Sequence, residues 1–206
     1  MNDTKELILQ TALGLFSQNG YKATSVSMIA DAVGVTKGAL YKHYRNKQAI
    51  LDSIVDRICQ MDTENAHKHE VPDDTYDKSP LPYRSTTMRQ ICEFMETQFL
   101  FWTRDGFARN FRRLLTIEQF KDPIMMDLYQ KCLVDGPVSY VEDLFREMIN
   151  RGVLKNDDPR QLALELYAPF YFLVSMADSS PDKKELRRRL SEHIERFCER
   201  NVVLET

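Results

Sequence analysis

The sequence predicts an all-α protein with an N-terminal three-helix helix-turn-helix unit followed by a larger helical domain. Three observations support this fold class. Only seven of the 206 residues are glycine, whereas the good helix formers Leu, Glu, Ala, Lys and Arg are abundant. Apolar residues recur every three or four positions along most of the chain, as they do on one face of a helix. No segment has the alternation of apolar and polar residues that indicates a half-buried strand.

Four helices are expected in the first 70 residues, and each has a capping side chain or a terminating glycine. They cover about 4–19, 26–33, 37–44 and 47–67. The side chains that can accept hydrogen bonds from free N–H groups at the second, third and fourth starts are Thr24 or Ser25, Thr36, and Asn46. Gly20 and Gly34 end the first two helices, because glycine readily adopts the left-handed conformation that follows a helix.

A segment rich in proline and aspartate, 71–85, is predicted to be a loop and a domain boundary. The rest of the chain is predicted to be helical again. The expected helices cover about 88–103 and 106–119, a helix capped by Asp122, its continuation to Asn150 after a break at Gly136-Pro137, a helix capped by Asp158, and a last helix over 182–201.

The composition is that of a globular, soluble protein, with 43% hydrophobic and 29% charged residues. The N-terminus lacks the pattern of a signal peptide, and no run of about 18 apolar residues occurs. We therefore expect a cytoplasmic protein without a membrane anchor. The four cysteines form no CxxC motif and are expected to be reduced thiols rather than a disulfide framework.

Charge is unevenly distributed. The chain carries a net charge of −3, yet residues 1–60 contain seven Lys or Arg against five Asp or Glu, which leaves −5 for the remainder. The segment 34–47, GVTKGALYKHYRNK, has four Lys or Arg and no Asp or Glu. This asymmetry indicates an anionic partner for the N-terminal part.

Three residues at the start of this segment have the properties that a helix-turn-helix requires. Ala30 is a small residue for the contact between two helices, Gly34 allows a left-handed turn, and Leu40 provides an apolar anchor on the second helix. Their spacing alone fits an ordinary three-helix bundle equally well. The small and basic start of the third helix favours DNA binding over a merely solvated basic face, because helix N-termini and cationic side chains both bind phosphate.

The segment ILQTALGLFSQNGYKATSVSMIADAVGVTKGALYKHYRNKQAIL resembles the DNA-binding domain of the TetR family of transcriptional regulators. The resemblance covers about the first 55 residues. The matching positions are Phe16, Gly20, Thr24, Ile29, Ala30, Gly34, Val35, Lys37, Gly38, Leu40, Tyr41, His43, Tyr44, Asn46 and Lys47. Lys42 departs from the family, which often has a second tyrosine there. Tyr44 stands where phenylalanine is usual, at a position that packs inward, so its hydroxyl needs a partner.

The resemblance implies a DNA-binding domain over 1–47, a connecting helix over about 47–67, and a ligand-binding and dimerisation domain over 48–206. The candidate DNA contacts are Thr24, Ser25, Thr36, Lys37, Gly38, Ala39, Tyr41, Lys42, His43 and Lys47. Among them, Lys37, Gly38 and Ala39 are expected to approach bases. Tyr41, Lys42, His43 and Lys47 are expected to hold the phosphate backbone.

The effector pocket that the resemblance implies is expected among the aromatic and methionine side chains between the N-terminal part and the last two helices. Such stripes are usually core, but they also line adaptable apolar pockets. The candidate pocket residues are Phe94, Met95, Phe99, Trp102, Phe111, Met125, Tyr129, Phe145, Tyr167, Phe170 and Tyr171.

A homodimer is expected through the last two helices. The helix from about 162 to 176 is apolar nearly all round and must be covered on two sides, and the helix after it carries a narrow apolar stripe. The candidate interface residues are Leu162, Leu166, Leu173, Leu186, Leu190, Ile194 and Phe197. The alternative is that both helices belong to the core of one subunit.

The function predicted from these features is a ligand-responsive DNA-binding regulator of the repressor class, with an operator, a small-molecule effector and a second copy as partners. The alternative is a helix-turn-helix protein without an effector that acts through a protein partner. An enzyme is not expected, because no phosphate-binding loop or nucleophile elbow occurs. No cofactor or metal is expected, since the two-residue spacing of His67 and His69 does not suit helical metal ligands.

Overall fold

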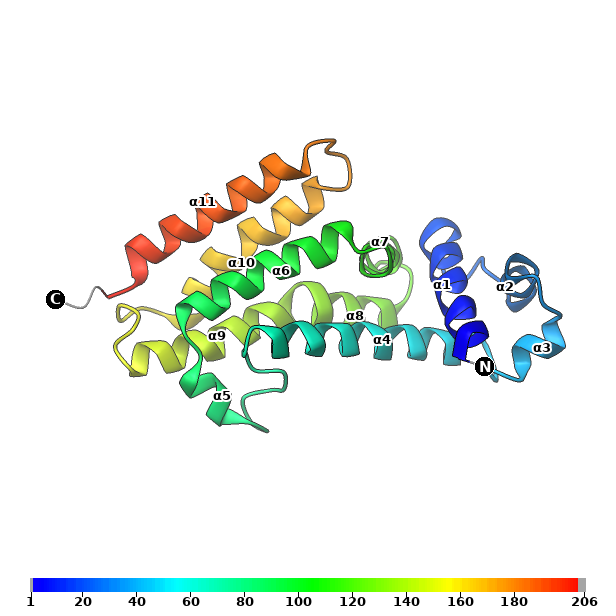
Figure 1. The fold of residues 1–206 in the computed structure, drawn as a ribbon, viewed down its shortest axis with the longest axis horizontal. Helices are drawn as coiled ribbons and strands as arrows, with labels where there is room; N and C mark the ends of the chain where they lie inside the picture. The colour runs from blue at the N-terminus through cyan, green and yellow to red at the C-terminus, as the bar shows by residue number, and fades with distance from the viewer. Residues whose placement is uncertain (1, 204–206) are drawn as a thin grey trace. The chain divides into compact units, whose positions relative to one another are not determined.

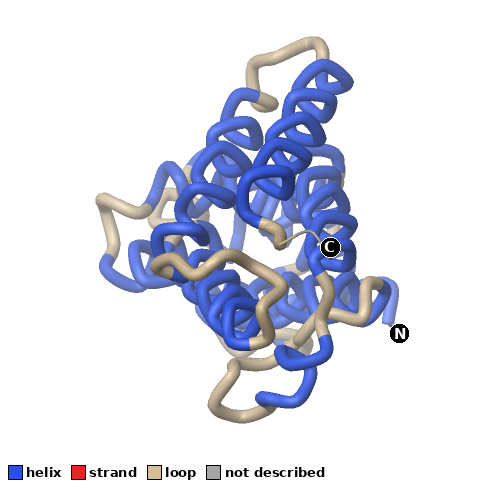
Figure 2. The backbone as a smooth tube through the Cα atoms, turned by 90° about the vertical axis from the view of Figure 1, so that its left-hand side faces the viewer, coloured by secondary structure: helices blue, strands red, loops and turns tan. Residues whose placement is uncertain are grey.

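The computed structural model describes residues 2–203, and this part of the chain is almost entirely helical. Figure 2 shows helices joined by loops, and the described residues form no strand beyond an isolated bridge between Leu154 and Val202. The helices are α1 (Asn2–Asn19), α2 (Val26–Val33), α3 (Lys37–Tyr41), α4 (Lys47–Lys68), α5 (Pro80–Ser85), α6 (Met88–Arg104), α7 (Gly106–Glu118), α8 (Pro123–Leu133), α9 (Asp135–Asn150), α10 (Pro159–Met176) and α11 (Lys183–Asn201). The predicted all-α fold is confirmed. Within the described residues, no helix combines the length and the apolar character that crossing a bilayer requires.

The chain folds into two compact units. One contains the residues up to 61 together with 105–129, and the other contains 62–104 together with 130 onwards. The first unit therefore includes the helix-turn-helix, most of α4, and α7 with the start of α8. The sequence predicts a boundary between residues 47 and 48 that separates a DNA-binding domain from a ligand-binding domain. This functional division stays a prediction, because the compact units are defined by packing alone.

In the first unit, α1 packs against both α2 and α7. Its buried residues include Ile8, Ala12 and Phe16, which carry the predicted apolar face. Gly20 ends α1 with φ 88°. A Cβ at this position would lie 2.7 Å from Glu118 Oε1, so glycine is required here both by its backbone conformation and by the close approach of α7.

In the second unit, α10 packs against α9, α11 and α6, and Figure 1 shows α6, α10 and α11 running alongside one another. The buried aromatic rings include Phe99 and Phe145, and the Phe145 ring stacks on Phe197 at 5.5 Å between centroids. These helices therefore share one apolar core.

Three boundaries differ from the sequence predictions. The segment expected to be a loop contains α5, where Tyr83 is buried and its hydroxyl donates to the carbonyl of Asp74 at 2.9 Å. Helix α3 ends at Tyr41, three residues early. The break expected at Gly136-Pro137 falls at Val134, because proline is tolerated in the first turn of α9. A Cβ on Gly136 would lie 1.9 Å from the carbonyl oxygen of Lys131, so this glycine allows the two helices to meet closely.

Candidate nucleic-acid interface

The turn between α2 and α3 has the geometry that the sequence predicted. Gly34 is left-handed, with φ 80° and ψ 29°, and the N–H of Val35 donates to the carbonyl of Ala30 at 2.9 Å. Ala30 and Leu40 are buried. The structural roles predicted for Ala30, Gly34 and Leu40 are therefore confirmed.

Both helices of the motif begin at a hydroxyl cap. Ser25 Oγ accepts a hydrogen bond from the N–H of Met28 at 3.2 Å, and Thr36 Oγ1 accepts one from the N–H of Ala39 at 3.1 Å. Such caps satisfy N–H groups that a helix leaves free at its start. The start of α3 is thus fixed by the glycine turn before it and by the Thr36 cap directly ahead of its first residue, Lys37.

The outer face of α3 is open and carries positive charge. Lys37, Gly38, Tyr41 and Lys42 are exposed, and the Lys37 ammonium lies 5.9 Å from the centroid of the Tyr41 ring. Ala39 and His43 are half-buried. No acidic residue lies anywhere in 34–47, so the segment itself contributes no carboxylate to oppose an incoming phosphate.

Gly38 is not required by the fold of this chain. Its backbone is not left-handed, and a Cβ built there meets no atom within 4 Å. Ala39, beside it, has only a methyl group. The start of α3 therefore has almost no protruding side chains, so a second molecule can approach its backbone closely.

The polar atoms of two predicted DNA contacts are engaged by backbone carbonyls within the domain. The Thr24 side chain is completely buried, and its hydroxyl donates to the carbonyl of Gly20 at 2.9 Å. The Lys47 ammonium donates to the carbonyls of Tyr21 at 2.7 Å and Thr24 at 2.9 Å. Partial burial lowers the pKa of Lys47. Both side chains hold the turn between α1 and α2.

Tyr21 is the centre of that turn, and the sequence reasoning did not select it. The Lys47 ammonium lies 4.4 Å from its ring centroid, and its hydroxyl donates to Gln48 Oε1 at 3.0 Å. Its ring meets Phe16 edge-on at 5.1 Å. Burial, followed by the carboxylates of Asp52 and Asp122, raises the pKa of Tyr21. The only feature of the sequence that could have indicated this role is the position of Tyr21 directly after Gly20, which ends α1.

Tyr44 packs inward as predicted, and its hydroxyl has a partner. The residue is 4% exposed, and its hydroxyl forms a hydrogen bond with the Ser53 side chain. The extra hydroxyl, relative to phenylalanine, is therefore accommodated without leaving a buried polar group unpaired.

Comparisons with known proteins point to the same part of the chain. Residues 8–54 match the family model described as bacterial regulatory proteins, tetR family. The uncharacterised HTH-type transcriptional regulator YhgD of Bacillus subtilis is 28% identical over 176 residues, which cover 82% of this chain and 83% of that protein. These matches identify residues 8–54 as a DNA-binding domain of the TetR family. The chain is therefore a DNA-binding transcriptional regulator.

Two further comparisons reach beyond residues 8–54. The class C tetracycline repressor protein of Escherichia coli is 29% identical over 102 residues, covering 50% of this chain and 42% of that protein. The structure of a SmeT–triclosan complex superimposes with a TM-score of 0.70 at 21% identity, covering 98% of this chain and 92% of that one. At this identity the superposition establishes the helical fold.

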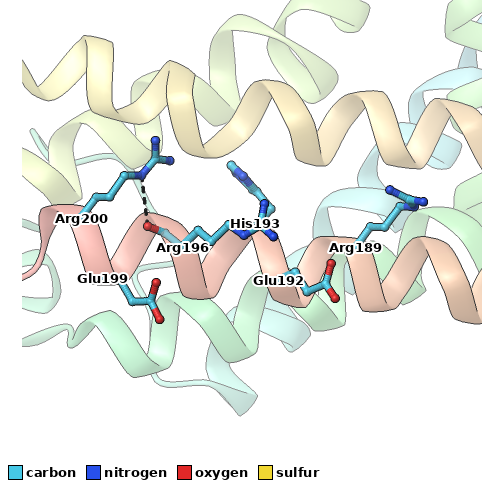
Figure 3. Close-up of a pocket in the computed structure, with 6 residues that line it drawn as sticks. All are labelled: Arg189, Glu192, His193, Arg196, Glu199 and Arg200. Carbon is cyan, nitrogen blue, oxygen red and sulfur yellow. Dashed lines mark hydrogen bonds between the residues drawn. The ribbon is translucent and has the colours of Figure 1, made fainter.

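The predicted pocket residues of this TetR-family chain are distributed over both units. Most of those in the second unit are buried on α6, α9 and α10, namely Met95, Phe99, Trp102, Phe145 and Phe170, whereas Phe94, Tyr167 and Tyr171 are half-buried. In the first unit, Phe111 and Met125 are buried and Tyr129 is half-buried. The hydroxyl of Tyr167 donates to the carbonyl of Leu133 at 2.7 Å. Surface hollows lie elsewhere, one of them along α11 between Arg189 and Arg200 (Figure 3).

The predicted dimer residues lie in the core of a single chain. Leu162, Leu166, Leu173, Leu186, Leu190, Ile194 and Phe197 are each 8% exposed or less. The apolar side chains that α10 leaves open are on its other face, at a spacing of four residues: Leu164, Ala168, Phe172 and Met176. Phe172 is 64% exposed. A dimer surface on α10 would therefore use this second face.

The two histidines considered as metal ligands have separate partners. His67 Nε2 lies 2.7 Å from Asp73 Oδ2, and His69 Nε2 lies 2.8 Å from Thr97 Oγ1. These contacts join the end of α4 to the following loop and to α6. They give each ring a local structural role.

Proposed function

We propose that this TetR-family protein is a homodimeric repressor that binds a DNA operator through α3 and is released from it by a small apolar effector. The observation that best supports operator binding is the open, carboxylate-free face of α3. Its exposed side chains include the ammonium groups of Lys37 and Lys42 and the phenol of Tyr41. The caps at the starts of α2 and α3 and the Gly34 turn between them hold these side chains in place. Cationic groups of this kind bind phosphate, while base edges set the sequence preference.

The predicted contacts divide into two groups under this proposal. The exposed or half-exposed ones, from Thr36 to His43, touch DNA directly. Ser25 is exposed at the start of α2 and can meet a phosphate beside its cap. Thr24 and Lys47 act indirectly, because their polar atoms are engaged by carbonyls of the α1–α2 turn. We therefore expect Lys42 rather than Lys47 to contribute to the salt dependence of binding.

The dimer is proposed to form through α10 and α11. The exposed Leu164, Ala168, Phe172 and Met176 make an apolar stripe on α10, which a second copy can cover to complete a four-helix arrangement. Homodimers with twofold symmetry place the same patch on both subunits. Two reading helices then meet two half-sites about one helical turn of DNA, or a multiple of it, apart.

The effector is proposed to bind within the second unit, among the aromatic side chains of α6, α9 and α10. The half-buried Phe94, Tyr167 and Tyr171 are the side chains there that can change partners most readily. Two similar proteins have a small molecule in their names, tetracycline for the repressor and triclosan for the SmeT complex, which supports an effector of this size class. For an effector to act, it must bind the released conformation more tightly than the DNA-bound one.

Selection from a random DNA library followed by titration over a range of salt concentrations tests the operator proposal. We expect one enriched palindromic motif and an affinity that falls steeply with salt. Failure to enrich any motif would contradict it. A thermal-shift screen with small aromatic compounds tests the effector proposal, since a ligand that binds the folded state raises the melting temperature. If no compound both raises the melting temperature and weakens operator binding, the alternative of a protein partner is favoured.

A further inference from the structure

Two cysteines far apart in sequence face each other inside the second unit. Cys92 lies on α6 and Cys198 lies on α11, and their sulfur atoms are 3.8 Å apart. Both side chains are half-buried, so a small reagent can reach them. The other two cysteines provide a comparison in the same chain, because Cys59 on α4 is exposed and Cys132 lies on α8.

The approach of these two sulfurs is fixed by contacts on one side along α6 and α11. Lys183 donates to the carbonyl of Thr103 at 2.8 Å, and Glu96 accepts from Arg187 at 2.7 Å and from Ser191 at 3.0 Å. As the residue numbers rise along α11, those of the contacted residues fall along α6, so the two helices run antiparallel. The cysteine pair lies one turn further along α6, in the register that these contacts set.

The end of α11 is also held on the other side of Cys198. The N–H of Lys155 donates to the carbonyl of Asn201, and the N–H of Val203 donates to the carbonyl of Val153, both at 2.9 Å. The C-terminal turn of α11 is therefore tied to the turn that follows α9. With contacts before and after it, Cys198 cannot slide away from Cys92 without breaking several hydrogen bonds.

The two thiols are electronically different. A hydrogen bond from Cys92 lowers the pKa of Cys198, although burial and the carboxylate of Glu195 oppose this effect. The same hydrogen bond, then burial and the charge of Glu96, raise the pKa of Cys92. Because the thiolate is the reactive form, Cys198 is the better nucleophile of the pair and Cys92 is placed to act on it afterwards.

We propose that Cys92 and Cys198 form an oxidation site at which a hydroperoxide closes an intrachain disulfide between α6 and α11. The Cys198 thiolate attacks the peroxide, so that an S–O bond forms, the O–O bond breaks, and the alkoxide or hydroxide leaves and takes up a proton. The Cys92 sulfur then attacks the sulfenic sulfur, the S–S bond forms, and water leaves. Two thiols and one hydroperoxide give one disulfide, one alcohol or water, and one further water. From 3.8 Å, the sulfurs must approach by about 1.8 Å to reach the bond length of about 2.0 Å.

The closed disulfide would fasten α6 to α11 covalently in the register already present. This property is independent of the proposed effector, because it requires only that the second unit folds as described. Its failure would leave the operator and effector proposals untouched, and their failure would leave this one untouched.

The experiment uses the full chain, titrated with hydrogen peroxide, alkylated, digested and analysed by mass spectrometry without reduction. We expect a chain without interchain disulfides that has lost two hydrogens, a peptide pair joining Cys92 to Cys198, and full reversal by dithiothreitol. The pair should close at a lower peroxide concentration than that which oxidises Cys59. The double variant Cys59→Ser/Cys132→Ser should behave like the wild type.

Two single variants separate the roles of the sulfurs. In Cys92→Ser, the sulfenic acid on Cys198 should persist long enough to be trapped by dimedone. In Cys198→Ser, Cys92 should resist both oxidation and dimedone labelling. The proposal is overturned if the wild-type chain yields only sulfinic acids or interchain disulfides, or if Cys59 reacts before the pair closes.

Discussion

Replacing Lys47 by Ala tests whether this lysine stabilises the fold of the first unit or contacts DNA. The Lys47 ammonium donates to two backbone carbonyls at 2.7 and 2.9 Å and lies 4.4 Å from the Tyr21 ring centroid. The variant removes these interactions, together with a longer hydrogen bond to the carbonyl of Lys22 at 3.4 Å, and leaves the carbonyls without this donor. We therefore expect a loss of stability in the first unit, whatever DNA is present.

The magnitude follows from the geometry. A hydrogen bond to a charged group contributes about 1.5–3 kcal/mol to stability, and a partly exposed cation–π contact contributes about 0.5–1 kcal/mol. The simple sum is too large, because the ammonium is only half-buried and its lowered pKa shows that desolvation opposes the charged form. We expect about 2 kcal/mol in the free energy of unfolding, a factor of about 30 in the equilibrium constant.

Lys42→Ala is the matched control, since Lys42 is exposed on the outer face of the same segment. It should leave the urea unfolding midpoint unchanged and reduce the slope of log affinity against log salt by about 0.9 per subunit, or about 1.8 per dimer. Lys47→Ala should do the opposite, lowering the midpoint while the salt slope stays near the wild-type value. If Lys47→Ala flattens the salt slope as Lys42→Ala does and leaves the midpoint unchanged, the assignment of Lys47 to the turn is refuted.

Three further predictions concern single side chains. Gly34→Ala should destabilise the protein by about 1–2 kcal/mol, because an L-residue must then adopt a left-handed conformation although its Cβ meets no other atom; urea unfolding measures this, and no change would contradict it. Gly38→Ala, with equal space but an ordinary backbone, should leave stability unchanged or raise it by up to about 0.5 kcal/mol and should weaken operator binding in an anisotropy titration, whereas unaltered affinity would exclude close approach of DNA there. Phe172→Asp should raise the dimer dissociation constant about 30-fold or more in analytical ultracentrifugation, as expected when an interfacial aromatic worth about 2 kcal/mol is lost. Phe120→Asp in the first unit, where the side chain is 84% exposed, is its control, and equal effects of the two variants would rule out the α10 face as the interface.

The helix-turn-helix could be predicted from the sequence because its determinants are local. The caps at Ser25 and Thr36 and the left-handed Gly34 each act within four residues of their own position. A hydroxyl residue directly before a helical apolar pattern, or a glycine directly after one, usually caps or ends that helix. The pattern therefore predicts the elements and the turn without reference to any long-range contact.

The role of Lys47 could not be predicted in this way. Its acceptors are carbonyls more than 20 residues earlier, and any residue type provides a carbonyl. Only the folded backbone shows that two of them converge on one ammonium. The family resemblance correctly marked Lys47 as a position of interest, but a residue pattern does not distinguish a phosphate contact from a backbone contact.

The sequence could not predict which face of α10 is available for the dimer interface. Helix α10 is apolar nearly all round, and the sequence correctly indicates that both sides need cover. It does not indicate which side its own chain covers. The regular leucines Leu162, Leu166 and Leu173 face inward, while Leu164 and Phe172, which interrupt that pattern, face outward.

The contacts in the first unit suggest how a change elsewhere in the protein reaches the reading helix. Lys47, at the first residue of α4, holds the turn between α1 and α2 through two hydrogen bonds. Gly20, at the start of the same turn, touches Glu118 of α7, and Glu118 is buried and paired with Lys121 at 2.9 Å. The one turn that precedes the helix-turn-helix is thus held by both α4 and α7. We infer that a displacement of either helix is passed to this turn, and through it to the start of α2, because moving α4 or α7 away from the turn would first break the Lys47 contacts or alter the close approach at Gly20.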